Sequence, residues 1–265
     1  MLTFRRQSAL PEIMAGPAYQ PEYMLLEVCC YGLESALSAQ QTGADRIELC
    51  ADPLQGGTTP SLGLIKVVRS RLHIPLDAII RPRGGDFMYS KAEFDVMIND
   101  LETCKQAGCD GAVLGILKQD GKVDMERCRQ LVDLAYPLGV TFHRAFDWTA
   151  DAEEAMEDII SLGCERILTS GQAPTAAQGT DLIAALVSKA DYRITIMPGA
   201  GIRAENIGDL VLRTGASEYH SSARMNKITA MGFLNIKLDN SEADRAEADP
   251  AEIAGMLAIL ARHSQ

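Results

Sequence analysis

Two Glu-x-Cys pairs stand within short apolar runs of this 265-residue chain: Glu27 with Cys29, and Glu48 with Cys50. Side chains alternate between the faces of a strand, so each glutamate shares a face with its cysteine. A buried glutamate is costly unless a cation pairs with it. Paired thiolates suit Cu(I), but two close thiols are also compatible with a disulfide or with simple packing. The residue types leave a metal site, a redox pair and an inert pair open.

Basic side chains follow several of the later apolar runs and provide partners for those carboxylates. They are Arg81, Arg83, His143, Arg144 and His220. Arginine binds carboxylate or phosphate groups with paired hydrogen bonds, so the three arginines would clamp an anionic metabolite. Glu27 or Glu48, its pKa raised by burial, would act as general acid or base, and either histidine would carry a proton. The alternative is an ion-pair network that only packs the interior.

A glycine-containing turn and a serine follow the last two apolar runs. Backbone N–H groups in such a turn, leading into a helix, can hold a phosphate, and barrels often place one at this point. We therefore expect an anion-binding subsite at Gly199, Gly201 and Ser222. The competing interpretation is that the glycines only form a short loop.

The elements that would position these residues alternate regularly along the chain. Eight runs are typical of buried strands: Leu25–Cys30, Arg46–Cys50, Leu76–Pro82, Gly111–Leu117, Val140–Ala145, Arg166–Ser170, Ile194–Pro198 and Glu218–Ser222. Helices are expected near 33–42, 61–71, 91–107, 124–135, 151–162, 175–189, 203–213 and 250–262. A repeated helix-ending glycine precedes every second strand, at Gly43, Gly108, Gly163 and Gly215. The repeat of two βα units fits a closed eight-stranded barrel.

The alternation predicts a single-domain α/β fold, a (β/α)8 TIM barrel, over residues 24–265. Residues 1–23 are expected to form a loosely ordered extension. An open doubly wound sheet is disfavoured because no glycine-rich dinucleotide loop follows the first strand. Barrel chemistry lies at the carboxyl ends of the strands. Neighbouring strands are ~4.8 Å apart, so Cys29 and Cys50 are expected at matched height near the top, one layer above their glutamates.

Composition excludes some functions. With 25 Lys and Arg against 36 Asp and Glu, the formal net charge is 25 − 36 = −11. That balance argues against binding to nucleic acid or to an anionic membrane, and no apolar run approaches the ~18 residues of a membrane span. Seven cysteines without a secretory signal predict a reduced, cytoplasmic protein.

Several runs together resemble the CutC copper-homeostasis family. They are Leu26-Glu27-Val28-Cys29, Gly43-Ala-Asp-Arg-Ile-Glu-Leu-Cys50, Gly56-Gly-Thr-Thr-Pro-Ser61, Ile80-Arg-Pro-Arg-Gly-Gly-Asp-Phe87, Val140-Thr-Phe-His-Arg-Ala-Phe-Asp147, Leu168-Thr-Ser-Gly171 and His220-Ser-Ser-Ala223. The resemblance extends in order from about Leu25 to Arg224. It implies a (β/α)8 barrel, a cytoplasmic location, a homo-oligomer and a role with copper, Cys29 and Cys50 being the Cu(I) ligands.

Two functions remain open at this stage. One is a copper homeostasis protein that binds Cu(I) through the thiolates of Cys29 and Cys50 without turnover. The other is a barrel enzyme that uses general acid/base chemistry on a small anionic metabolite, phosphorylated ones included. Arginine does not bind copper, so copper storage leaves the arginines at the mouth without a role. These unexplained arginines are the reason to retain the enzyme hypothesis.

Overall fold

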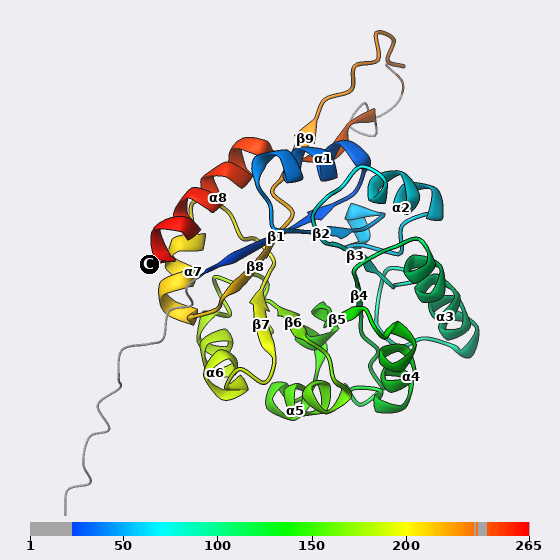
Figure 1. Cartoon of the computed structure of the whole chain (residues 1–265), viewed down its shortest axis with the longest axis vertical. Coiled ribbons are helices and arrows are strands. Elements are labelled where there is room, and N and C mark those ends of the chain that lie inside the picture. Colours follow the sequence, from blue (N-terminus) through cyan, green and yellow to red (C-terminus); the bar gives the residue numbers. More distant parts are fainter. Residues whose placement is uncertain (1–22, 236, 238–242, 265) are drawn as a thin grey trace, which may run out of the picture.

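Eight parallel strands form a barrel with helices around it (Figure 1). The computed structural model describes residues 23–235, 237 and 243–264. The strands are β1 (Leu25–Cys30), β2 (Arg46–Leu49), β3 (Leu76–Ile79), β4 (Gly111–Leu114), β5 (Gly139–Phe142), β6 (Arg166–Thr169), β7 (Thr195–Pro198) and β8 (Glu218–Ser221). Hydrogen bonds join β1 through β7 in sequence and join β8 to β1, while β7 and β8 lie side by side. The predicted (β/α)8 barrel is confirmed; the expected extension at 1–23 lies outside the described residues except for Tyr23.

The outer helices follow the strands one by one. They are α1 (Leu33–Thr42), α2 (Leu62–Arg69), α3 (Lys91–Gln106), α4 (Met125–Ala135), α5 (Ala152–Leu162), α6 (Thr180–Ala190), α7 (Ile207–Thr214) and α8 (Pro250–His263), with short 3-10 turns η1 (Pro53–Gln55) and η2 (Arg144–Trp148). Local sequence explains their ends: Gly43, Gly163 and Gly215 adopt the left-handed conformation that closes α1, α5 and α7. No helix in the described part of the chain is long and apolar enough to cross a membrane.

The two faces of the barrel wall differ in character. Leu26, Val28, Ile47 and Leu49 face the helices, and each is fully buried in the main apolar core. Burying one such side chain stabilises the fold by about 1.5–3 kcal/mol. The alternate residues of β1 and β2 point inward and carry charge or sulfur, as the sequence predicts. The apolar outer layer therefore supports a polar interior.

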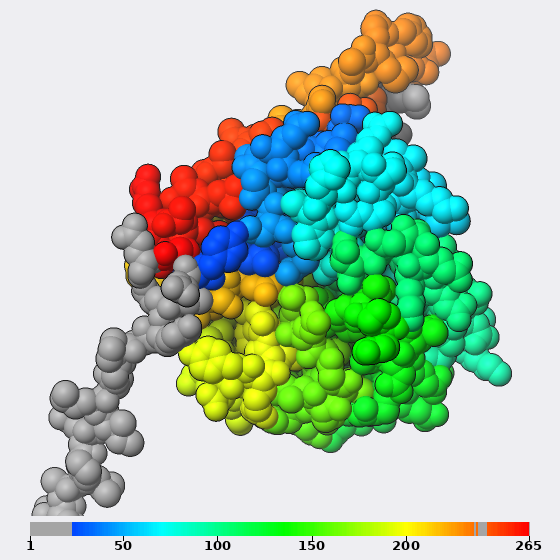
Figure 2. Space-filling model, viewed as in Figure 1, coloured from blue at the N-terminus to red at the C-terminus, as the bar shows by residue number. Residues whose placement is uncertain are grey.

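An antiparallel hairpin projects from the barrel between β8 and α8 (Figures 1 and 2). Its strands are β9 (Arg224–Lys227) and β10 (Arg245–Ala248). Residues 245–248 of the acidic segment 239–249 form β10, and residues 239–242 lie outside the described residues. Lys227 and Arg245 both pair with Glu247, so the hairpin compensates its own acidic charge.

Candidate functional site

An ion-pair network fills the lower interior of the barrel, with Arg46 at its centre. Its Nε lies 2.5 Å from Oε2 of Glu27 and 3.6 Å from Oδ2 of Asp77, and its Nη2 lies 2.6 Å from Oε2 of Glu218. The cations expected from the sequence lie at later strand ends and do not include Arg46. The sequence does indicate that Arg46 points inward, because Arg46 stands two residues before Glu48 and therefore shares its face of the strand. This layer matches the alternative of a packed ion-pair network.

His220 on β8 lies between the two glutamates of the sequence motif. Its Nδ1 is 2.7 Å from Oε1 of Glu27, and its Nε2 is 3.6 Å from Oε2 of Glu48. Burial opposes a charged imidazole, but hydrogen bonds with Cys29 and Glu27 and the proximity of Glu48 raise the pKa of His220 well above its ordinary value. Burial also opposes an ionised Glu27, yet the His220 hydrogen bond and the Arg46 charge lower the pKa of Glu27 to about 2. Glu27 and His220 therefore form an ionised pair.

The sulfur atoms of Cys29 and Cys50 lie 3.5 Å apart above this layer. Both residues are buried, and they form a small cluster with Ile79 and Val113. The prediction of matched height is wrong, because the strand register places Cys29 beside Glu48 and leaves Cys50 beyond the end of β2. Strands in a closed barrel are tilted and staggered, so the two thiols meet diagonally.

The two thiols differ in acidity. The hydrogen bond between Cys29 and Cys50 lowers the pKa of Cys29 to about 5 against the effect of burial, and His220 contributes to the same shift. Burial and the adjacent Cys29 raise the pKa of Cys50. Burial and the charge of Cys29 likewise raise the pKa of Glu48. The Cys29 sulfur is therefore the more acidic of the two, whereas the neutral forms of Cys50 and Glu48 are favoured.

Two overlapping groups of side chains have the geometry to hold a metal ion. Cys29, Glu48 and Cys50 offer ligand atoms within 4.8 Å of one another, and so do Glu27, Glu48 and His220. Two thiolate sulfurs suit a soft ion such as Cu(I), which accepts few ligands. The second group is occupied by the ion pairs of Glu27, so the sulfur group is the better candidate.

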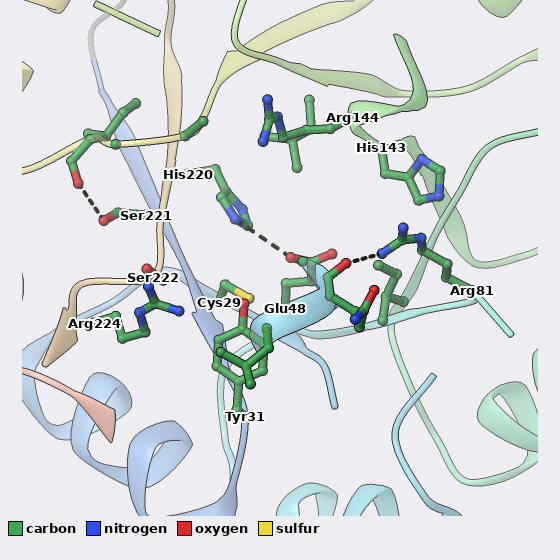
Figure 3. A pocket seen from close by; sticks show the side chains of 18 of the residues that line it. Cys29, Tyr31, Glu48, Arg81, His143, Arg144, His220, Ser221, Ser222 and Arg224 are labelled. Atoms are coloured by element: carbon green, nitrogen blue, oxygen red, sulfur yellow. Dashed lines mark hydrogen bonds and ion pairs between the residues drawn. The ribbon is translucent and has the colours of Figure 1, made fainter. Parts of the chain in front are cut away.

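A cavity of about 540 Å³ opens above the thiol pair at the carboxyl ends of the strands (Figure 3). Its lining includes Cys29, Glu48 and His220 at the floor. Among the lining residues, all within the described part of the chain, are four arginines, Arg81, Arg144, Arg203 and Arg224, whereas Glu48 is the one acidic residue. Cys50 is not among the lining residues and lies behind Cys29. The cavity is therefore strongly basic, in contrast with the acidic chain.

Arg81 and Arg83 separate although both follow β3. Arg81 is buried and lines the cavity, with its Nη atoms donating to three loop carbonyl groups and its Nε lacking a partner. Arg83 instead pairs with Glu93 at 2.6 Å and with Asp86 at 3.0 Å, and it is not a lining residue. The glycine turn after Arg83 folds its loop back on α3. Only Arg81 is placed to meet a ligand.

His143 and Arg144 both line the cavity from the end of β5. Burial and the charge of Arg81 lower the pKa of His143 to about 3, so its imidazole is neutral. Its Nε2 is buried without a partner. Arg144 is held by Asp147, whose Oδ2 accepts from Nε at 2.8 Å. These two side chains offer a neutral polar group and a fixed positive charge.

The predicted anion subsite is only partly assembled. Gly201 and Ser222 line the cavity, but Gly199 does not. The amide of Gly199 donates to a carbonyl of β6 at 2.8 Å, and an added Cβ would lie 2.5 Å from Cδ1 of Leu168. Gly199 therefore permits close packing behind the wall. Arg203 and Arg224, which sequence reasoning missed, lie in the same loops just beyond Gly201 and Ser222.

The fold and this mouth define a class: a (β/α)8 barrel protein with a paired-thiol, arginine-lined cavity at the carboxyl ends of its strands. The sequence matches the CutC family over residues 24–225, and the chain belongs to that family. A CutC family protein of Chromobacterium violaceum is 52% identical over 209 residues, which is 79% of this chain and 85% of the relative. One from Xylella fastidiosa is 54% identical over 199 residues, covering 75% and 74% of the two chains.

Solved structures agree on the fold. The CutC protein of Streptococcus agalactiae is 34% identical and superposes with a TM-score of 0.72, covering 75% of this chain and 98% of that chain. The phosphoribosyl anthranilate isomerase of Thermotoga maritima has a TM-score of 0.58 over 90% of this chain and 99% of that chain. At 14% identity the isomerase shows only a shared barrel fold.

Proposed function

We propose that this protein binds Cu(I) as its cargo through Cys29 and Cys50. The observation that carries the proposal is the 3.5 Å separation of their sulfur atoms, with one of them buried at the floor of an open cavity. Thiolate sulfur is the ligand type that Cu(I) prefers, and two sulfurs on neighbouring strands supply it without rearrangement of the barrel. The name of the Streptococcus agalactiae relative links it to copper homeostasis, which supports the same function here.

The residues around the thiols suit this cargo. Cys29 already carries a thiolate at neutral pH, so one ligand needs no deprotonation. Loss of the Cys50 proton on binding makes the affinity pH-dependent. The ionised Glu27–His220 pair beneath the thiols keeps a positive charge near the sulfurs, and this charge stabilises a bis-thiolate site with net negative charge.

The test is an anaerobic titration with Cu(I) in competition with a chromophoric Cu(I) chelator. We expect one Cu(I) per chain in the wild type and loss of that ion in Cys29→Ser/Cys50→Ser. Cys128→Ser is the matched control, because Cys128 is also buried but lies on α4 in the outer layer. Unchanged stoichiometry and affinity in the double variant would refute the site.

A second candidate function is favoured by the arginines, which copper binding does not use. In this proposal the protein is an enzyme acting on a small anionic metabolite, with Glu48 as proton donor and Arg81 and Arg144 as anion contacts. Glu48 suits that role because burial and Cys29 raise its pKa. Glu27 is not a lining residue, so it would position His220 instead.

Substrate screening by thermal shift tests this second function. Carboxylated and phosphorylated metabolites form the panel, since a ligand at 100 times its Kd adds about 2.7 kcal/mol of stability. Hits should weaken in Arg144→Ala and lose turnover, but not binding, in Glu48→Gln. A panel without hits, or hits indifferent to Arg144→Ala, would count against the enzyme.

A further inference from the structure

We infer that the cavity binds a phosphate monoester, with the phosphoryl group held at the β7 and β8 loops by Arg203, Arg224, Ser222 and the amides of Gly201 and Ile202. The inference rests on the second proposed function. It adds a substrate class and states which end of the cavity holds the phosphoryl group. It does not depend on copper binding.

Free hydrogen-bond donors gather at this end of the cavity. In the described part of the chain, the amides of Gly201, Ile202 and Ser222 donate no hydrogen bond, and the hydroxyl group of Ser222 has no partner. All three residues line the cavity. Backbone and hydroxyl donors that converge at the mouth of a barrel match the acceptor-rich surface of a phosphoryl group.

The adjoining helix does not supply this site. A helical turn before α7 begins at Arg203, but the amide of Arg203 already donates to Oδ1 of Asn206 at 2.9 Å. The next amide, that of Ala204, donates to Oε1 of Glu252 at 2.6 Å. The donors left for a ligand are therefore those of the loops themselves.

Two guanidinium groups add positive charge at the same place. Arg224 is exposed at the base of the hairpin, and its side chain makes no hydrogen bond or ion pair with any described residue. Arg203 donates from Nη2 to the backbone carbonyl of Arg224 at 2.8 Å and so has no counter-ion there. Neither charge is neutralised by a described carboxylate, whereas most other arginines in the described part of the chain have carboxylate partners. A dianionic phosphoryl group would supply the missing counter-charge.

The far side of the cavity also lacks partners for its polar atoms. Nε of Arg81 and Nε2 of His143 are buried without hydrogen bonds, in side chains that are 5% and 3% exposed. Figure 3 shows Ser222 and Arg224 on one side of the cavity, with Arg81 and His143 on the other and Glu48 between them. A ligand anchored by its phosphoryl group would extend its carbon skeleton over Glu48 toward these atoms.

Isothermal titration calorimetry in phosphate-free buffer tests the inference, with glycerol 3-phosphate, inorganic phosphate and lactate as probes. We expect glycerol 3-phosphate to bind once per chain, phosphate more weakly and lactate weakest. Arg224→Ala should raise the Kd of glycerol 3-phosphate about tenfold or more, as befits a lost charge-assisted hydrogen bond. Arg193→Ala is the control: it removes the same charge from an exposed pair with Glu157 and should change the Kd less than twofold.

Other outcomes would overturn the inference. Absence of phosphate-monoester binding at millimolar concentration would refute the site. Binding abolished by Arg144→Ala but unaffected by Arg224→Ala and Arg203→Ala would refute its position. Cu(I) titration of Arg224→Ala should still give one ion per chain, so a failure here is separable from a failure of the thiol site. If phosphate monoesters bind but none is turned over, the result would support this binding site and refute the enzyme function.

Discussion

Nδ1 of His220 lies 2.7 Å from Oε1 of Glu27, and this contact joins the packed interior of the barrel to its open mouth. Glu27 belongs to the Arg46 network below, while the other ring nitrogen of His220 faces Glu48 in the cavity above. The imidazolium therefore separates the buried ion-pair layer from the layer that lines the cavity.

Cys29 should titrate as an acidic thiol. Because the hydrogen bond with Cys50 lowers the pKa of Cys29 to about 5, one thiolate per chain should form as the pH rises through this value. Thiolate absorbance at 240 nm measures this, with circular dichroism confirming that the fold persists. The step should vanish in Cys29→Ser and move to higher pH in Cys50→Ala. A wild type without thiolate below pH 7 would contradict the assignment.

Arg46 should be among the most costly side chains to remove. Arg46→Met removes one of the two cations that pair with the buried Glu27 and leaves His220 as its partner, which costs about 3–5 kcal/mol of unfolding free energy. Chemical denaturation gives the value. Arg193→Ala, which breaks an exposed pair, should cost less than about 1 kcal/mol. Similar losses in the two variants would show that the network does not stabilise the barrel.

Asp77 should make stability fall with rising pH. Burial and the charge of Glu27 raise the pKa of Asp77 to about 7 in the folded protein, against about 3.9 unfolded. The folded state holds this proton more tightly, so the contribution is complete below pH 4 and is lost as pH rises toward 7. Relative to wild type, Asp77→Asn should gain up to ~4 kcal/mol between pH 4 and 8. Denaturant melts across this range measure the difference; parallel curves would disprove it.

Asp147 should be required to hold Arg144 in place. Its carboxylate accepts from Arg144 and from the hydroxyl groups of Thr169 and Ser170. Asp147→Ala leaves these donors unsatisfied and should cost at least ~2 kcal/mol. Asp209→Ala, which removes an exposed partner of Arg213, is the control and should cost little. Equal melting temperatures for the two variants would contradict this role.

The strand pattern was sufficient to predict the barrel and the inward direction of Glu27, Cys29, Glu48 and Cys50. Alternation of side chains is a local property, so a sequence carries it directly. Stagger between strands is set by closure of the whole barrel. For that reason the sequence correctly predicts that the Cys50 side chain points into the barrel, but wrongly predicts that it lies level with Cys29 along the barrel axis.

Loop residues were harder to place. Arg81 and Arg83 share parity, but the glycine turn between them and α3 sends only Arg81 to the cavity. Arg224 was missed because its position depends on the hairpin that begins with it. The inward direction of Arg46, in contrast, could be predicted from the sequence, since Arg46 shares a strand face with Glu48.

The basic rim has a kinetic consequence for the proposed metal cargo. A bare cation approaching Cys29 would cross the field of the guanidinium groups of Arg81, Arg203 and Arg224, which have no carboxylate partner among the described residues, and this field would slow its capture at low ionic strength. Delivery by a negatively charged carrier complex would reverse the sign of that effect. Under the proposed function, the rim would favour capture of the ion from an anionic complex over capture of the bare cation.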